Sequence, residues 1–561
     1  MNIRFFFLLS LIALLTLGAG TLHANDTLRL PHLGSTAAAV LSPAEAQAYG
    51  ASMFRQMRAL NLVLNDPLAD EYINGLGYRL VAASPEPTLH FTFFIARENV
   101  INAFAAPGGY IGINAGLITA THNQDELAAV MAHEISHITQ HHLERAFEDA
   151  KKTAPLIALA MLGALALGAS GAGGNAAVAA MAMGQGLALQ RQINFTRKDE
   201  AEADRVGMQT LARAGFSPDG MANFFARMET LLRADSGGYQ VPAILQNHPV
   251  TALRIAQARA RAHAIEARLH THPPTPIPKY VGWQDATLPL PYVKPTPNLL
   301  STSTQIDRPG SPRAEQYYLL MRERVRVLSS QDINGLIRYY ASNLANNPGF
   351  RIPSNRYGYA LALIRSGKGA QALHELAPLL HDQPDNLPIR LAWAHAELAA
   401  GRRKVALIHY DNLVRDWPRQ PAVALGTAQA LISSNRKSDG VRAETLLRPL
   451  LEDSNEPNIY RTYARAAELA GLKVRAAEAY ADATFISGHP IDALDQLHRL
   501  IRRPNLDYYQ RARIEARIAY LTPIALELQK RDRNKRKEAR NLLPYGNRSK
   551  DKDDGSGFLQ T

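Results

Sequence analysis

The chain has 561 residues, of which 46% are hydrophobic, and it carries a formal net charge of +12 and no cysteine. Its hydrophobic content excludes a wholly disordered chain, and its length predicts several domains. The lack of cysteine excludes disulfides, thiolate metal sites and a cysteine nucleophile, so any metal must be held by histidines and carboxylates.

The N-terminal residues have the pattern of a secretory signal peptide. Arg4 precedes an apolar run from Phe5 to about Leu17, and residues 22–24 offer a cleavage site. A signal anchor is the alternative, but the run is shorter than the roughly 20 residues that a membrane-spanning helix needs. We therefore expect a signal peptide over residues 1–24 and, with no cysteine in the chain, a soluble protein of the bacterial periplasm.

Two strands are predicted ahead of the main motif. Residues 89–96 (LHFTFFIA) and 108–116 (GGYIGINAG) are expected to be strands that flank a glycine turn. An edge strand beside a metal site can bind an extended peptide by strand addition, which reads backbone conformation more than sequence. Such binding would favour unfolded or stalled β-rich chains.

The stretch HEISH, residues 133–137, predicts a catalytic metal site on an amphipathic helix. Asn123 with Glu126 offers a capping box at the start of this helix. His133 and His137 are four residues apart, so both project from one face and can reach one ion. Glu134 lies beside the first ligand, where it can act as general base. Chance would give only about 0.03 such motifs in a chain of this composition.

Three further segments surround this helix. His141 and His142 are expected to be solvated or to contact the ligands from outside rather than to bind the metal. Residues 155–189 are apolar and rich in glycine and alanine. They form either a buried pair of core helices or a lid or membrane-touching hairpin over the site, and we favour the latter.

A third ligand is expected from the segment FTRKDEAEADRVG, residues 195–207. Glu200 and Asp204 are one turn apart on a helix that Thr196 can cap. One carboxylate could complete a set of two histidines and one acid, and the other could hydrogen-bond a ligand imidazole. The residues alone leave open which carboxylate does which.

These motifs together resemble the HtpX and CAAX-prenyl-protease type of zinc metallopeptidase. The resemblance rests on HEISH, on EAEAD at residues 200–204, and on NAFA with PGG at residues 102–109. The N-terminal stretches VLSPAEAQAYG and LNDPLADEYINGLGYRL resemble the exported, periplasmic branch of that family. The resemblance covers nearly the whole mature chain and is most specific in residues 99–204.

The resemblance implies a role for each of these residues. His133, His137 and Glu200 would hold one zinc ion per chain, and Asp204 would orient a ligand histidine. His248 lies in an HP loop ahead of a basic helix, as in the family. It would be a fourth ligand that latches the enzyme, or else a surface or oxyanion-assisting residue. Arg254 is a candidate oxyanion donor.

The C-terminal half is predicted to be a repeat domain. Ten prolines in residues 273–312 indicate a stiff linker. Beyond it, Gly367, Ala372 and Pro384 recur as glycine, alanine and proline 34 residues later. This period resembles the tetratricopeptide repeat, which stacks into a solenoid that binds other chains. An ordinary helical bundle is the alternative.

The basic tail, residues 529–561, has no interleaved aromatics in KRDRNKRKEAR, which argues against nucleic-acid binding. We expect it to be disordered, either as a solvated tail or as a peripheral contact with an anionic membrane.

The sequence therefore predicts a mainly α chain. A zincin-like metalloprotease domain with a small β-sheet would span residues 25–272, and a tetratricopeptide solenoid would span residues 313–528. The resemblance implies degradation of misfolded or stalled outer-membrane β-barrel proteins, with chaperone-like help in their assembly. The solenoid would contact these clients or the β-barrel assembly machinery. The alternative is a latched or non-proteolytic zinc-containing chaperone or adaptor.

Overall fold

Seven stretches of the chain are described in the computed structural model: residues 42–146, 148, 197–234, 244–245, 248–271, 308–452 and 454–542. The expected signal peptide, the apolar segment 155–189, the linker up to residue 307 and the tail beyond residue 542 lie outside these residues. Within them, no helix combines the length and the apolar character needed to cross a membrane.

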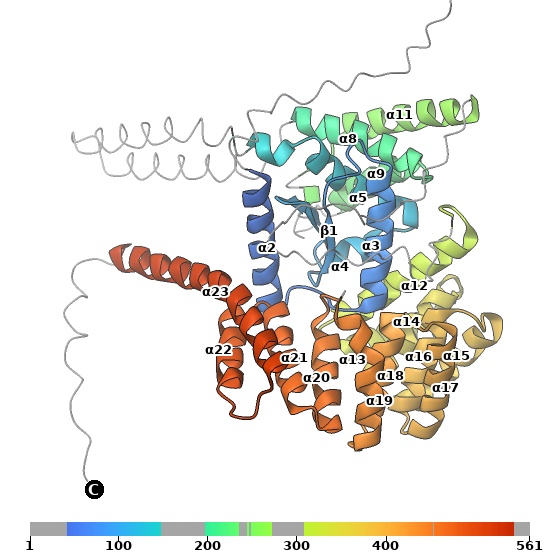
Figure 1. The fold of residues 1–561 in the computed structure, drawn as a ribbon. Helices are drawn as coiled ribbons and strands as arrows, with labels where there is room; N and C mark the ends of the chain where they lie inside the picture. The colour runs from blue at the N-terminus through green and yellow to red at the C-terminus, as the bar shows by residue number, and fades with distance from the viewer. Residues whose placement is uncertain are drawn as a thin grey trace, which may run out of the picture.

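The N-terminal part of the fold places helices around a small sheet (Figure 1). Its elements are α2 (Pro43–Ala59), α3 (Pro67–Ala82), β1 (Thr92–Ala96), β2 (Ala103–Ala106), β3 (Tyr110–Asn114), α4 (Ala115–Ala120), α5 (Gln124–Thr139), α8 (Arg197–Arg213), α9 (Asp219–Ala234) and α11 (Ala252–Thr271).

The sheet has the strand order β1-β3-β2. β1 runs parallel to β3, and β2 runs antiparallel to β3. Gly108 and Gly109 form the tight turn between β2 and β3, with φ values of 77° and 81°. The expectation that the two predicted strands flank this turn was therefore wrong. The turn joins β3 to a third strand, β2, whose sequence AFAA is short and rich in alanine, a residue that is depleted in strands.

Helix α5 lies at the centre of this part, in contact with α3, α8, α9 and β2. Every residue of α5 except Asp125 is buried. Asn123 caps the helix as expected, because its Oδ1 accepts the Glu126 N–H at 2.9 Å. The reciprocal half of the capping box is not formed. The Glu126 carboxylate instead accepts from the His122 N–H and pairs with Arg227 at 2.6 Å.

The C-terminal part is a curved row of helices. They are α12 (Pro312–Ser329), α13 (Ile333–Asn346), α14 (Pro353–Arg365), α15 (Gly369–Asp382), α16 (Leu387–Ala399), α17 (Arg403–Asp416), α18 (Pro421–Ile432), α19 (Lys437–Leu447), α20 (Pro457–Ala470), α21 (Lys473–Ile486), α22 (Pro490–Ile501) and α23 (Tyr508–Leu542), with 3₁₀ turns η3 (Pro348–Phe350) and η4 (Arg448–Leu451).

The predicted repeat is confirmed by this row. Gly367, Gly401 and Gly471 each have φ between 77° and 86° and separate the two helices of a pair, where a left-handed residue ends the first helix. Ala372 and Ala406 are buried where paired helices meet. The tail differs from expectation, since α23 continues to Leu542 and residues 529–542 are therefore helical.

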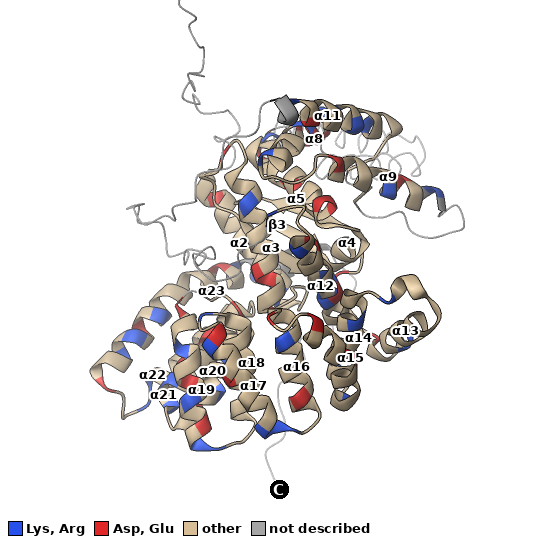
Figure 2. Ribbon diagram, turned by 90° about the vertical axis from the view of Figure 1, so that its right-hand side faces the viewer, with Lys and Arg blue, Asp and Glu red and all other residues tan. Residues whose placement is uncertain are grey.

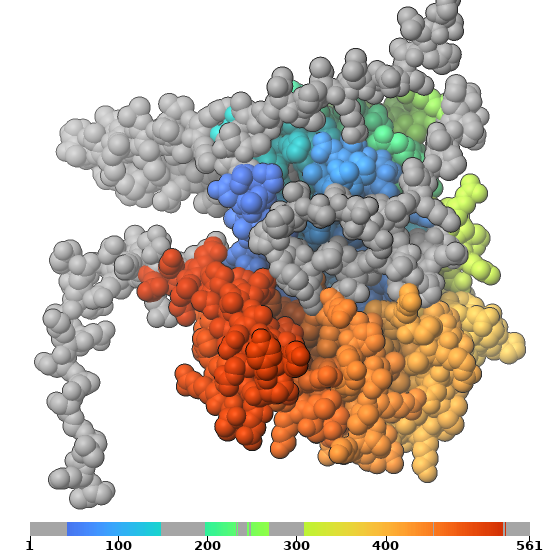
Figure 3. Space-filling model, in the orientation of Figure 1, coloured from blue at the N-terminus to red at the C-terminus, as the bar shows by residue number. Residues whose placement is uncertain are grey.

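The repeat helices pack against α2 and α3, so the two parts share an interface (Figures 1 and 3). Arg324 of α12 donates to both carboxylate oxygens of Asp66, the N-cap of α3, at 2.6 and 2.7 Å. Gln420 donates to Glu71 of α3 at 2.7 Å. Helices α19–α22 carry residues of both charge signs (Figure 2), and some of them pair, as Glu444 does with Arg448 and Arg475.

Candidate metal centre

His133 and His137 lie on one face of α5, one turn apart. Their Nε2 atoms are 3.0 Å apart, and both residues are buried. The four-residue spacing on a helix brings both imidazoles to one point, as the sequence predicts.

Helix α8 brings two carboxylates to these histidines. Glu200 places one oxygen 3.6 Å from His133 Nε2 and the other 3.6 Å from His137 Nε2. Asp204 lies on the other side of the first ring, with Oδ1 3.1 Å from His133 Nδ1. Gly207 lies where α8 approaches α5 closely, and a Cβ there would lie 3.2 Å from the His133 backbone nitrogen, a tight contact.

His248 reaches the same point from the segment between α9 and α11. Its Nδ1 is 2.7 Å from Glu200 Oε1 and 3.4 Å from His133 Nε2. One side-chain donor atom from each of four residues, His133, His137, Glu200 and His248, lies within 4.8 Å of all the others. Upstream in this segment, the Ile244 N–H donates to the Ile101 carbonyl at 3.1 Å, just before β2.

Arg254, at the start of α11, supports the carboxylates from behind. Its Nε and Nη2 donate to the two oxygens of Asp204 at 2.9 and 2.7 Å. Its Nη1 lies 3.0 Å from Glu200 Oε2 and donates to the Pro249 carbonyl. The guanidinium is thus engaged by the two carboxylates, and a role for Arg254 as an oxyanion donor stays a prediction.

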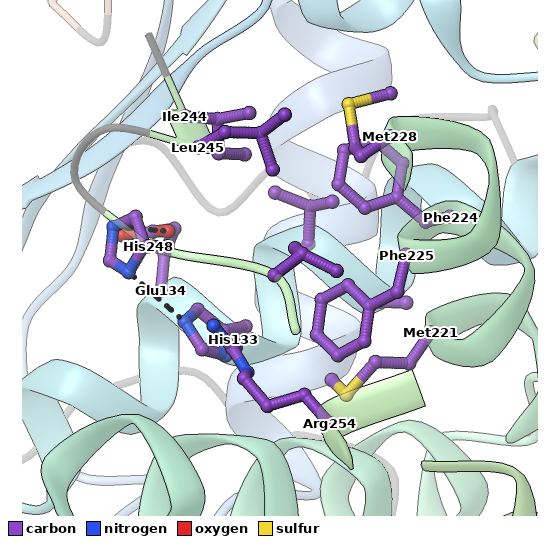
Figure 4. Close-up of a pocket in the computed structure, with 13 residues that line it drawn as sticks. His133, Glu134, Met221, Phe224, Phe225, Met228, Ile244, Leu245, His248 and Arg254 are labelled. Carbon is purple, nitrogen blue, oxygen red and sulfur yellow. Dashed lines mark hydrogen bonds and ion pairs between the residues drawn. The ribbon is translucent and has the colours of Figure 1, made fainter. Parts of the chain in front are cut away.

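Glu134 is fully buried beside the first histidine. Among the residues that the structure describes, neither of its carboxylate oxygens has a hydrogen-bond partner. His248 Nε2 lies 3.8 Å away. Figure 4 shows Glu134, His133 and His248 together at one side of a pocket. Its opposite wall is apolar and comes largely from α9, through Met221, Phe224, Phe225 and Met228.

The groups around the two histidines shift their pKa values in opposite directions. Burial alone would lower the pKa of His133, but the neighbouring carboxylates of Asp204 and Glu200 outweigh it and raise that pKa to about 10. Burial would raise the pKa of Glu200, yet His133 and His248 hold it well below its usual range. Burial and the neighbouring rings lower the pKa of His137. The carboxylates thus favour a cation among the donors.

The donor atoms match the ligand set of a catalytic zinc site. Two imidazoles and one carboxylate, without thiolates, are a common ligand set for catalytic zinc, and they leave further coordination positions free. The unpaired Glu134 carboxylate beside them has the position that a general base requires.

His141 and His142 were expected to be solvated or to contact the ligands from outside, and each residue takes one of these positions. His141 is partly exposed, and its Nδ1 lies 3.8 Å from Glu144. His142 is buried against His137. Sequence reasoning did not find the role of Arg254, because no local pattern marks a bidentate pair between residues fifty positions apart.

Comparisons with known proteins agree with this centre. The family model for peptidase family M48 matches residues 67–262. A β-barrel assembly-enhancing protease of Yersinia pestis is 31% identical over 505 residues, covering 90% of this chain and 93% of that protein. The protein of that name from Escherichia coli strain K12 is 29% identical over 514 residues, covering 91% and 95%.

More distant matches cover parts of the chain. The metalloprotease LoiP of Escherichia coli is 28% identical over 31% of this chain and 64% of its own length. The crystal structure of the P58(IPK) TPR domain aligns with 69% of this chain and 99% of its own at 13% identity, with a TM-score of 0.16 that carries no weight here. The family follows from the 31% identity to the Yersinia pestis protein, which extends over nearly the full length of both chains. The chain belongs to peptidase family M48, resembles β-barrel assembly-enhancing proteases over nearly its whole length, and is a metalloprotease.

Proposed function

We propose that the chain is a periplasmic zinc endopeptidase that degrades misfolded or stalled outer-membrane β-barrel proteins and assists their assembly. The observation that carries this proposal is the buried set of His133, His137 and Glu200 with the unpaired Glu134 beside it. A structural metal site has no use for such a carboxylate, whereas hydrolysis requires a base.

The proposed mechanism assigns one task to each residue. His133, His137 and Glu200 would hold zinc, which when bound supplies Lewis-acid polarisation of the scissile carbonyl and of the attacking water. Glu134 takes the proton from that water and returns it to the leaving amine. Asp204 fixes the orientation of His133, and Arg254 in turn holds Asp204.

The client is inferred from the relatives and from the sheet. The near full-length relatives are named for β-barrel assembly. In this chain β2 is an edge strand that contacts α5. An extended peptide added to that edge would lie close to Glu134 and would be recognised through its backbone. Unpaired strands of a stalled barrel offer such a backbone, and the repeats would contact the client or the assembly machinery.

A latched or non-proteolytic chaperone is the second candidate. It is favoured by the position of His248, which lies against Glu200 at 2.7 Å and would complete a four-residue ligand set. Four protein ligands would leave no open position for the attacking water in a tetrahedral site.

Degradation of an unfolded outer-membrane barrel protein by the purified mature chain tests the proposal. The Glu134→Gln variant is the control for the active site, and an unfolded helical protein of similar length is the control for the client. We expect the barrel protein to be cleaved faster than the helical one, and only by the wild type. Equal cleavage of both would contradict the client, and no cleavage of either would favour the chaperone.

A further inference from the structure

The chain folds back on itself directly after the metal-binding helix. Helix α5 ends at Thr139, Gln140 caps it, and His141 has a left-handed φ of 55°. Residues 142–146 then begin a new helical turn. On a continuous helix, side chains five residues apart would point about 140° away from each other. The left-handed residue removes this separation and brings His142 beneath His137.

His142 contacts the ring of His137 on the side away from the metal centre. The two Nδ1 atoms are 2.8 Å apart, and both residues are buried, His142 to 1% exposure. The His137 Nε2 atom faces the opposite way, toward His133 and Glu200. Each nitrogen of His137 therefore has a separate task.

Two carboxylates of α8 lie beside the His142 nitrogen that points away from His137. Its Nε2 is 3.3 Å from Glu202 Oε2 and 3.9 Å from Asp199 Oδ1. Arg145 holds both carboxylates, at 3.3 Å from Glu202 and 3.0 Å from Asp199, and also donates to the Gln140 carbonyl. The row from His137 through His142 to Glu202 is thus fixed at its outer end by a guanidinium.

The direction of hydrogen bonding follows from the carboxylate. Ionised Glu202 can only accept, so the His142 Nε2 carries the hydrogen. A neutral ring then has a lone pair on Nδ1, which accepts from the His137 Nδ1–H. His137 is left with a lone pair on Nε2, the atom that faces the other donors. With the opposite tautomer of His142, the hydrogen of His137 would sit on Nε2 and block metal binding.

We propose that His142 and Glu202 are positioning residues for His137. They fix its Nδ1–H tautomer and its ring orientation, as Asp204 with Arg254 does for His133. The inference rests on the proposed function, since it concerns a ligand of the proposed zinc ion. The two ligand histidines then differ in how they reach a carboxylate. His133 meets one directly, and His137 meets one through a second imidazole.

A second cation held by His142, Asp199 and Glu202 is the competing explanation, because these three residues also lie within reach of one ion. Arg145 argues against it. Its guanidinium already pairs with both carboxylates, so a metal cation would have to compete with it for them.

Zinc affinity of the full mature chain, measured by competition with a chromophoric chelator, tests the inference. His142→Leu removes the acceptor for His137 and should weaken zinc binding about 10- to 100-fold. His142→Asn places an amide oxygen near the position of Nδ1, where it can accept from His137, and should recover most of that loss. His141→Asn is the matched control at the neighbouring, partly exposed histidine, and should bind as the wild type does. Asparagine tolerates the left-handed backbone there.

Spectra and stoichiometry separate the outcomes. Cobalt bound to His142→Leu should show altered visible bands, while the melting temperature of the metal-free variant should match that of the metal-free wild type. If the leucine variant does not fold, Glu202→Leu, which removes the acceptor for His142, takes its place with the same expected loss. Wild-type affinity and spectrum in the variant that folds would overturn the inference.

Three results distinguish the ways in which it could fail. Two zinc ions per wild-type chain, reduced to one in His142→Leu, would replace the inference with the second cation site. A wild type without zinc would overturn the proposed function as well. One tightly held zinc that His142→Leu keeps equally would overturn this inference alone.

Discussion

The pKa values of buried carboxyl groups in this protein differ according to the charges beside them. Burial works against ionisation of Asp66, but the Arg324 guanidinium holds its pKa below the ordinary value. Burial raises the pKa of Glu456, at the start of α20, to about 7 despite the Asn458 N–H and the charge of Arg58. Burial and the charge of Glu456 also raise the pKa of Asp70. One carboxyl group is thus stabilised as an ion and two are not.

This difference predicts a pH-dependent stability for one residue. The folded state binds the Glu456 proton more tightly than the unfolded state, so stability falls as pH rises from 4.5 to about 7, with the full penalty above that. Glu456→Gln keeps an acceptor for the Asn458 N–H but cannot ionise. We expect it to be more stable than the wild type by about 1–3 kcal/mol at pH 8 and nearly equal to it at pH 4.5.

Thermal midpoints of both proteins at pH 8 and near pH 4.5 check this expectation. Glu468→Gln, on the same helix but about half exposed, is the control and should show no gap that changes with pH. A gap for Glu456→Gln that is constant with pH, or larger at the acid end, would contradict the account.

At the level of single residues, the sequence could predict which side chains lie together but not the partners of every charge. The four-residue spacing of His133 and His137 fixes a common face wherever a helix forms. The contact between His142 and His137 requires a left-handed backbone at His141. A histidine in the sequence does not predict that conformation. Arg254 pairs with Asp204 across fifty residues, which no local pattern records.

At the level of elements, the segment that carries His248 lies where a substrate is expected to lie. Ile244 donates to the Ile101 carbonyl beside β2, Leu245 lines the pocket, and His248 reaches Glu200. Ile244 and His248 would compete with an extended peptide for the backbone just before β2 and for the metal-facing position. The proposed enzyme would therefore be slow until the segment moves.

Removal of the His248 imidazole should release this inhibition. We expect His248→Ala to cleave an unfolded barrel protein several-fold faster than the wild type, because a ligand position becomes open to water. His263→Ala, on α11 and exposed, is the control and should cleave at the wild-type rate. A His248→Ala variant that cuts no faster than the wild type would argue against inhibition and would favour a direct role of His248 in the reaction.

Prediction of helices and strands succeeded where the hydrophobic periodicity is strong, and it failed where the element is short. Helix α5 and the repeat helices show a sustained helical pattern. Strand β2 has four residues, three of them alanine, and its place in the sheet comes from pairing with β3 rather than from its own propensity. The parallel pairing of β1 with β3 is set by the chain that crosses between them, which the strand sequences do not specify.

At the scale of the whole molecule, the repeats are docked closely on the protease helices. Arg58 of α2 donates to the Ile486 carbonyl at 3.2 Å, and Gly488 follows in the turn after α21. A Cβ on Gly488 would lie 2.2 Å from the Arg55 carbonyl oxygen and 2.7 Å from the Ala59 nitrogen. The period of the repeats predicts a solenoid, but not this docking, because its contacts join distant residues, 428 positions apart for Arg58 and Ile486.

Gly488 offers a direct test of this docking. Gly488→Ala and Gly471→Ala both place alanine at a left-handed φ, 92° and 86°, but a Cβ at Gly471 would meet no atom within 4 Å. The strain common to both should cost about 1 kcal/mol. Only Gly488→Ala should lose a further 1–3 kcal/mol by overlap and increase the radius of gyration in solution scattering. Equal stability and equal size of the two variants would show that the interface does not form in solution.

The central claim is that His133, His137 and Glu200 form a metal centre whose base is Glu134. Zinc content and peptide cleavage, measured on the same preparations of wild type and Glu134→Gln, test it most directly. We expect one zinc per chain in both proteins. Cleavage should occur in the wild type alone, with a loss of at least about 100-fold in the variant, and should be abolished by a chelator. A wild type without zinc, or a Glu134→Gln variant that cleaves at the wild-type rate, would contradict the claim.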